Sequence, residues 1–134
     1  MRSAQECVTV FGERRCVPHR AVAERLRDIL EAIERVDAYA KGITFEQFCL
    51  DRKTIEAAQF NFIVIGEAAR HVPEDIVAQH PEVAWREMRG LRNIVAHAYF
   101  NVSLPVLWET MVSDLPPLVA AIRELLEQIE AGQT

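Results

Sequence analysis

The chain has 134 residues, of which half are hydrophobic and 26% charged, with a formal net charge of −5. This size and composition predict one globular domain with enough apolar mass for a core. The acidic balance argues against a general nucleic-acid binder, because such proteins carry a basic footprint on their surface. An enzyme that contacts only a few phosphates in a local cleft stays compatible with it.

The N-terminal segment, residues 1–19, differs in pattern from the rest of the chain. β-Branched residues lie on both sides of Gly12, which predicts either a loose tail or a short hairpin. Cys7, Cys16 and His19 are candidate zinc ligands, but their spacing matches no standard site and a fourth ligand is not apparent. Three cysteines in all argue against a disulfide framework. We therefore expect no metal site and no cofactor.

Nothing in the sequence predicts a membrane segment. No run of about 18 apolar residues is present, so no transmembrane helix is expected. The start of the chain lacks the charged and then apolar pattern of a secretory signal. The expected compartment is therefore the cytoplasm.

From Ala21 the hydrophobic pattern becomes helical. Apolar residues recur alternately four and three positions apart, which places them on one stripe of a helix that ends at Gly42. The stripe consists of Val22, Leu26, Ile29, Ile33, Val36 and Ala40. Thr44 and Gln47 then form a capping-box pattern, which predicts a short helix with its two phenylalanines turned inward.

A second long helix is predicted from about Arg52 to His71, because a proline two residues later stops it. Its apolar stripe consists of Ile55, Ala58, Phe62, Ile65, Ala69 and Val72. Residues 73–81 predict one helical turn flanked by prolines. The third long helix is expected to begin near Pro81 and to run through Val95, since proline favours the first turn of a helix.

Ser103 is the predicted N-cap of a last long helical region, with Pro105 in its first turn. Pro116–Pro117 must kink or break that region near Leu115, after which the apolar pattern resumes. No run with the period of a strand follows residue 20. We therefore predict an all-α bundle of four main helices plus short helical turns, formed by residues 20–132 as a single domain.

The third long helix has two distinct faces. At about 100° per residue, Met88, Leu91 and Val95 share one arc, which is the face expected in the core. Gly90 lies in the middle of this helix, where a glycine costs stability. The cost is offset if the space left by the absent side chain allows the close approach of a partner subunit or a phosphate. The opposite arc holds Arg86, Gly90, Asn93 and His97, with Arg89 beside it.

Arg92 and Tyr99 lie off that polar face. Arg92 is about 140° from His97 on an ideal helix, so the two converge only if the arginine side chain curls round or a second chain contributes. Tyr99 is predicted to lie past the helix end. An ordinary structural explanation also exists: the helix dipole favours Arg and His near a C-terminus, and a following Tyr commonly packs as an amphipathic plug.

The stretch R-N-I-V-A-H-A-Y, residues 92–99, has the pattern R-x-x-x-x-H-x-Y and resembles HepT-like proteins, a branch of the HEPN superfamily. The resemblance covers about residues 22–130, and it implies a HEPN-like helical bundle that dimerises. In this family the Arg, the polar residue after it and the His line a cleft between two subunits, which corresponds to Arg92, Asn93 and His97 here. Other segments that resemble the family lie at 25–33, 65–69, 85–93 and 106–116.

The resemblance also implies an activity and partners. Many HEPN proteins are ribonucleases that need no metal, and HepT-like members act as toxins. Their usual partner is a small Mnt-type nucleotidyltransferase antitoxin, which neutralises the toxin by adding AMP to the motif tyrosine, here Tyr99. The expected protein is thus a homodimeric endoribonuclease of a toxin–antitoxin system.

The residue types suit this chemistry. Cleavage of RNA through its 2′-hydroxyl needs a base, an acid and a cation, and His97 suits the proton transfers because histidine titrates near neutral pH. Arg92 suits the phosphate because it stays charged and binds in a bidentate way. Arg86 and Arg89 would extend the local positive patch. One chain supplies one such histidine, so a two-fold symmetric dimer supplies the second.

Two other functions stay open at this point. The chain can be a non-catalytic HEPN dimer that binds a partner or a nucleotide, which the acidic composition favours. It can also be an ordinary helical bundle in which Arg92 and His97 are only helix-end residues. RNA cleavage by the protein would favour the ribonuclease over the non-catalytic dimer. A monomer in solution would favour the ordinary helical bundle.

Overall fold

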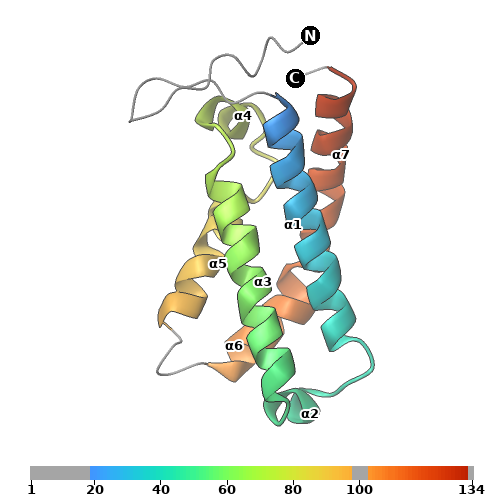
Figure 1. The fold of residues 1–134 in the computed structure, drawn as a ribbon, viewed down its shortest axis with the longest axis vertical. Helices are drawn as coiled ribbons and strands as arrows, with labels where there is room; N and C mark the ends of the chain where they lie inside the picture. The colour runs from blue at the N-terminus through green and yellow to red at the C-terminus, as the bar shows by residue number, and fades with distance from the viewer. Residues whose placement is uncertain (1–18, 98–102, 133–134) are drawn as a thin grey trace.

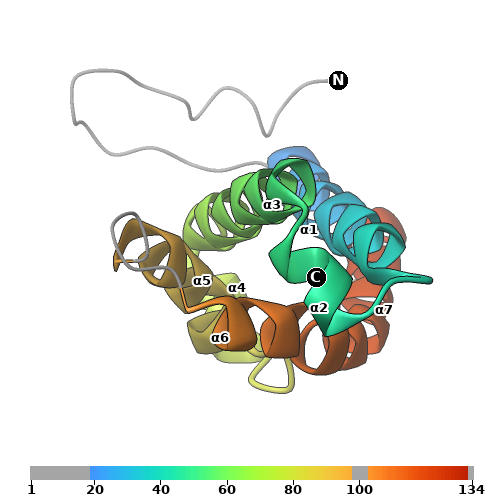
Figure 2. The same cartoon turned by 90° about the horizontal axis from the view of Figure 1, so that it is seen from below.

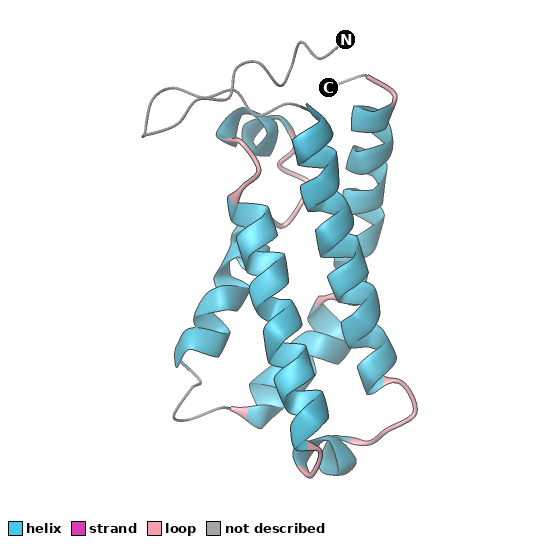
Figure 3. Ribbon diagram, in the orientation of Figure 1, coloured by secondary structure: helices cyan, strands magenta, loops and turns pink. Residues whose placement is uncertain are grey.

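A computed structural model describes residues 19–97 and 103–132, with side chains described for 21–95 and 103–132 (Figure 1). Every regular element in these residues is a helix (Figure 3). The elements are α1 (His19–Ala40), α2 (Phe45–Cys49), α3 (Arg52–Arg70), α4 (Glu74–Gln79), α5 (Trp85–His97), α6 (Leu104–Glu109), the π-helical turn η2 (Thr110–Asp114), the 3₁₀ turn η3 (Pro116–Leu118) and α7 (Val119–Glu130). The predicted all-α class and the four long helices α1, α3, α5 and α7 are confirmed.

The long helices form a bundle in which α5 has an outer position. Helix α1 packs between α3 and α7, and α5 packs principally on the other side of α3 (Figure 2). Helices α3 and α5 run in opposite directions, because the chain turns back through α4 (Figure 1). One side of α5 therefore faces α3, and much of the rest faces away from the bundle.

The predicted apolar stripes form the core. In α1 the residues from Val22 to Val36 on the stripe are buried, and in α3 Ala58, Phe62, Ile65 and Ala69 are buried as well. Ile55 lies only partly buried at the start of α3. Burying apolar area at about 25 cal/mol per Å² is the main favourable contribution to this fold.

Local sequence signals at the helix ends are confirmed. Thr44 and Gln47 make the reciprocal capping box, and Phe48 is buried against Trp108 of α6. Asp51 caps α3, and the hydroxyl and backbone N–H of Thr54 hold the pKa of this carboxyl below its usual value. At the N-terminus of each helix, these oxygens accept bonds from backbone N–H groups that have no partner inside the helix.

The break at the two prolines is also confirmed, and its form is specific. Pro116 lacks a backbone N–H and so cannot continue the helical hydrogen bonds. Leu115, the residue before it, closes a wide turn by donating its N–H to the Thr110 carbonyl oxygen at 3.0 Å. Ser103 caps α6 as predicted, with its hydroxyl accepting from the Val106 N–H. The predicted single last region is thus divided into α6, η2, η3 and α7.

The predicted start of the third long helix near Pro81 is wrong. Helix α5 begins at Trp85, and the residues before it form turns. The indole Nε1 of Trp85 donates to the His80 carbonyl oxygen at 2.9 Å, and the Val83 N–H donates to the same oxygen at 3.2 Å. Because Val83 and Trp85 are both buried, the connection follows their tertiary packing and not the local preference of proline.

Some predictions lie outside the described residues. These include residues 1–18 of the tail or hairpin predicted for 1–19, with Cys7 and Cys16, and the placement of Tyr99, whereas His19 begins α1. Among the side chains that are described, no group of three or more His, Cys, Asp or Glu is placed to hold a metal ion. No helix in the described ranges is long and apolar enough to cross a membrane.

Candidate functional site

The polar face of α5 lies on the outside of the bundle, as the sequence predicted. Arg86 and Asn93 are exposed, whereas Met88 and Leu91 are buried. Val95, which was expected in the core, is only partly buried at its edge. The two faces therefore separate as the 3.6-residue period requires.

Gly90 lies in the middle of this face and is not needed for packing within the chain. A Cβ atom added to it would meet no atom within 4 Å. Glycine in a helix costs about 1 kcal/mol relative to alanine, and no contact among the described residues offsets that cost. The open backbone at Gly90 leaves room for an external group to approach α5.

An open groove of about 1120 Å³ runs beside the same face, between α5, α4 and the end of α3. Asn93 and Gly90 both line it. The pKa of Glu82 lies below its usual value, because its own backbone N–H and the ring of His80 bond to the carboxylate. The charged residues along the groove are Arg70, Glu74, Glu82, Arg86, Glu87 and Arg89, so cations and carboxylates balance.

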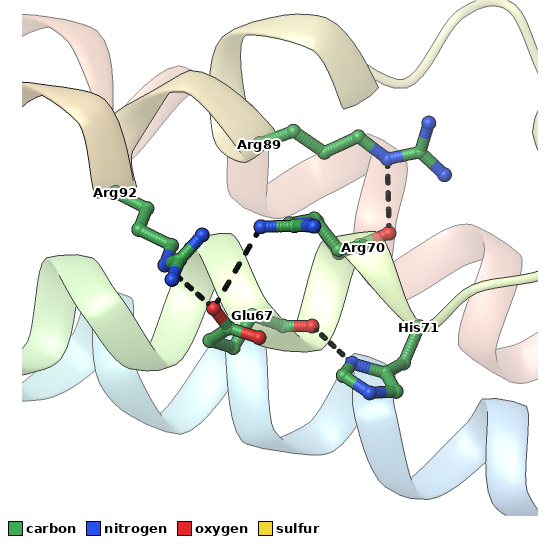
Figure 4. Close-up of polar contacts among 6 residues, drawn as sticks. Glu67, Arg70, His71, Arg89 and Arg92 are labelled. Atoms are coloured by element: carbon green, nitrogen blue, oxygen red, sulfur yellow. Dashed lines mark hydrogen bonds and ion pairs between the residues drawn. The ribbon is translucent and has the colours of Figure 1, made fainter.

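Arg92 pairs with α3, through a carboxylate that is not among the residues predicted for the site. Its Nε lies 2.7 Å from Oε2 of Glu67 on α3. Nη1 of Arg70 lies 3.9 Å from the same carboxylate oxygen. Figure 4 shows the two guanidinium groups converging on Glu67 from two helices. The side chains of Arg92 and Glu67 are 48% and 40% exposed, so the pair is open to solvent.

Gly66, the residue before Glu67, is the reason that α3 and α5 approach closely at this point. A Cβ atom at Gly66 would lie 3.1 Å from both Cβ and the backbone N of Arg92. Such contacts are tighter than ordinary van der Waals separation, so only glycine fits without a shift of α5. A glycine next to Ile65 of the apolar stripe, in the middle of a long helix, is the sequence signal for this approach.

Arg89 has a different environment from the one expected of a free phosphate ligand. Its Nε donates to the Ala69 carbonyl oxygen at 3.1 Å and its Nη2 to the Val72 carbonyl oxygen at 3.3 Å. Its Nη1 also pairs with Glu74 at 3.1 Å. These carbonyls lie at or just after the C-terminal end of α3, and the Ala69 oxygen also accepts from the Val72 N–H at 3.3 Å. Arg89 therefore connects α5 to the ends of α3 and α4.

The remaining predicted site residues are placed only in part. His97 is the last residue of α5, one turn after Asn93, and its side chain is not among those described. Tyr99 follows outside the described residues. Arg92 and Asn93 are both exposed, the first paired with Glu67 and the second lining the groove. That Arg92 and His97 meet in one site stays a sequence-based expectation.

The sequence was compared with known protein families and proteins. The family described as ribonuclease HepT-like matches residues 29–125. A protein of Thermococcus cleftensis named "Probable ribonuclease HepT" is 41% identical over 106 residues, which cover 79% of this chain and 96% of that protein. A Methanocaldococcus jannaschii protein named "Putative RNase" is 32% identical over 114 residues, covering 85% of this chain and 94% of its own.

A third relative, also named an RNase, comes from Caldanaerobacter subterraneus and is 33% identical over 103 residues, covering 77% of this chain and 92% of its own. No solved structure gives a significant match. The matches extend over almost the whole length of these relatives and include α3 and α5, which carry Glu67 and Arg92. The chain therefore belongs to the ribonuclease HepT-like family.

Proposed function

We propose that the protein is an endoribonuclease that needs no metal and acts as the toxin of a toxin–antitoxin pair. The observation that carries this proposal is the exposed Arg92 guanidinium, next in sequence to the groove-lining Asn93, in a chain whose family relatives are named as ribonucleases. Arg92 and Asn93 are both exposed, and His97 follows them as the last residue of α5. Arginine is suited to this position because its planar fork binds phosphate oxygens in pairs.

The proposed reaction follows from these residue types. A base removes the proton of the RNA 2′-hydroxyl, and the resulting oxygen attacks the adjacent phosphorus. The bond from phosphorus to the 5′-oxygen breaks, and an acid returns a proton to that leaving oxygen. Histidine performs either proton transfer near neutral pH, so His97 takes this role. Arg92 stabilises the additional negative charge that develops on the phosphate oxygens.

A direct test is cleavage of cellular RNA by the purified protein with and without a chelator. We expect equal rates in both, because every group in the proposed reaction is a side chain. Loss of cleavage on chelation, with recovery on adding a divalent cation, would contradict the metal-independent mechanism. No cleavage at all would favour a HEPN-type module that binds a partner or nucleotide, and the carboxylates along the groove are the observation in support of that alternative.

We also propose that the active form is a homodimer, in which two-fold symmetry supplies a second His97 to the site. Phe60 and Ile63 support this because they are 63% and 37% exposed on α3. At about 100° per residue they share one face of α3 with Glu67 and Arg70. An exposed apolar pair continuous with a functional surface is a natural place for a second subunit.

The dimer makes a specific prediction for the exposed phenylalanine. Phe60→Glu is expected to shift the protein from dimer to monomer at micromolar concentration, because a charge would have to be buried in the interface. Light scattering after size-exclusion chromatography measures the mass. The control is Leu50→Glu, which changes a residue that is 89% exposed and follows α2 at one end of the bundle (Figure 1). A dimer retained by Phe60→Glu would place the interface elsewhere.

The proposed partner is an Mnt-type nucleotidyltransferase that adds AMP to Tyr99. On co-expression with such an enzyme, we expect the intact mass to rise by one or more AMP units and RNA cleavage to be lost. The added group is bulky and anionic, so it blocks RNA sterically and by charge repulsion next to the site. A mass shift that persists in Tyr99→Phe would contradict the assignment of this residue.

A further inference from the structure

The carboxylate of Glu67 lies between two arginines and belongs to a different helix from the proposed reacting groups. It approaches Nε of Arg92 at 2.7 Å and Nη1 of Arg70 at 3.9 Å (Figure 4). Glu67 and Arg70 are three residues apart on α3, where neighbouring side chains can meet. Arg92 reaches the pair from α5, so this contact is a tertiary one.

The contact uses a particular edge of Arg92. A guanidinium has five N–H donors, one on Nε and four on the two Nη atoms. The ion pair with Glu67 is made through Nε, so the four N–H donors on the two Nη atoms are left to bind a phosphate. A half-exposed arginine without such a contact would sample many rotamers, and ordering it on substrate binding would cost entropy. A fixed guanidinium avoids that cost in the transition state.

The backbone around Glu67 holds this geometry. Gly66 allows α3 to lie directly against α5 at Arg92, with no space for a side chain between them. The Glu67 carbonyl oxygen is also 2.7 Å from Nδ1 of His71, near the end of α3. The carboxylate therefore comes from a packed helix and not from a loop, which is the support that a positioned arginine needs.

We propose that Glu67 is a positioning residue of the ribonuclease site, which orients Arg92 toward the RNA phosphate, and that Arg70 on the same carboxylate is a second phosphate-binding cation. This inference rests on the proposed ribonuclease function. It assigns functional roles to two side chains of α3, whereas the sequence pattern pointed only to α5 and the residues after it.

The proposal makes a distinctive kinetic prediction. Glu67→Gln removes a negative charge near the bound RNA, so the KM for RNA should stay equal or fall. At the same time kcat should fall by roughly 10- to 100-fold, because a misplaced catalytic group loses this much when it is displaced by about 1 Å. Glu67→Asp, which keeps the charge on a shorter side chain, should recover part of kcat. Arg70→Ala should raise the KM, since it removes a cation.

The test compares steady-state cleavage of one defined RNA by wild type, Glu67→Gln, Glu67→Asp and Arg70→Ala. The matched control is Glu56→Gln, which breaks the exposed pair of Glu56 and Arg52 on the same helix. Both glutamates form half-exposed or exposed pairs, so neither variant should change the melting temperature much. Glu67→Gln should not lower kcat further in an Arg92→Ala background, because a positioning residue acts on kcat only through its partner.

Several outcomes distinguish this proposal from other roles. A lower kcat without a higher KM, together with the absence of a further loss of kcat in Arg92→Ala, supports it. An unchanged or raised kcat in Glu67→Gln overturns it, because Glu67 would then be a bystander or would block RNA. A loss that is equal in the Arg92→Ala background also overturns it. If the wild type cleaves no RNA, the proposed function fails and this inference fails with it. If the wild type cleaves RNA and Glu67→Gln has the same kcat, only this inference fails.

Discussion

The His97→Ala protein is expected to lose RNA cleavage by roughly 10²- to 10⁴-fold, which is the usual contribution of a positioned acid or base. Arg92→Ala is expected to lose roughly 10²- to 10³-fold, because one group that stabilises charge in the transition state contributes about this much. Single-turnover cleavage of a defined RNA measures both losses without interference from product release.

Two controls separate these losses from misfolding. Arg35→Ala removes an arginine that pairs with Glu31 on the exposed surface of α1, and we expect it to cleave RNA at the wild-type rate. Circular dichroism and thermal melting of all variants test whether the bundle is retained. Wild-type cleavage by folded His97→Ala protein would show that the assignment of the site is wrong. It would leave the helix-end explanation of this residue as the better one.

The Gly66→Val protein is expected to unfold at lower urea concentration, with a loss of about 1–3 kcal/mol in the free energy of unfolding. A Cβ atom at Gly66 would lie 3.1 Å from the backbone N of Arg92, which moves only if α5 moves. The same displacement shifts Arg92 away from Glu67, so cleavage should fall even under conditions where the variant is folded.

Gly90→Val is the matched control for this prediction. A Cβ atom at Gly90 would meet nothing within 4 Å, and valine has a somewhat better helix propensity than glycine. Its free energy of unfolding should therefore be equal to that of the wild type or slightly higher, as urea titration measures. Equal destabilisation by the two substitutions would contradict the close approach of α3 and α5 as the reason for Gly66.

Much of the fold could be predicted because its signals are local. The apolar stripes of α1 and α3, the capping box at Thr44 and the break at Pro116–Pro117 depend on residues within a few positions of one another. Side chains three and four positions apart share a helix face whatever the rest of the chain does. The polar face of α5 was predicted for the same reason, and the structure confirms the exposure of Arg86 and Asn93.

The features that the sequence did not predict depend on tertiary contacts. The start of α5 was placed near Pro81 because proline favours a first turn, but the packing of Trp85 and its bond to the His80 carbonyl moved that start to residue 85. Arg89 stays a predicted phosphate ligand, and helical spacing did not show that its Nε and Nη2 donate to the Ala69 and Val72 carbonyl oxygens. Neither partner is a neighbour that helical spacing reveals.

The sequence by itself determined which face of α5 is polar and, through its family pattern, which residues are candidates for chemistry. Only the tertiary structure decided what holds Arg92, because Glu67 lies on another helix and reaches it through the antiparallel register of α3 and α5. That register depends on a glycine that lets the two backbones meet. Periodicity reports the direction of a side chain within its own helix, and contact with a second helix depends on how the two helices pack.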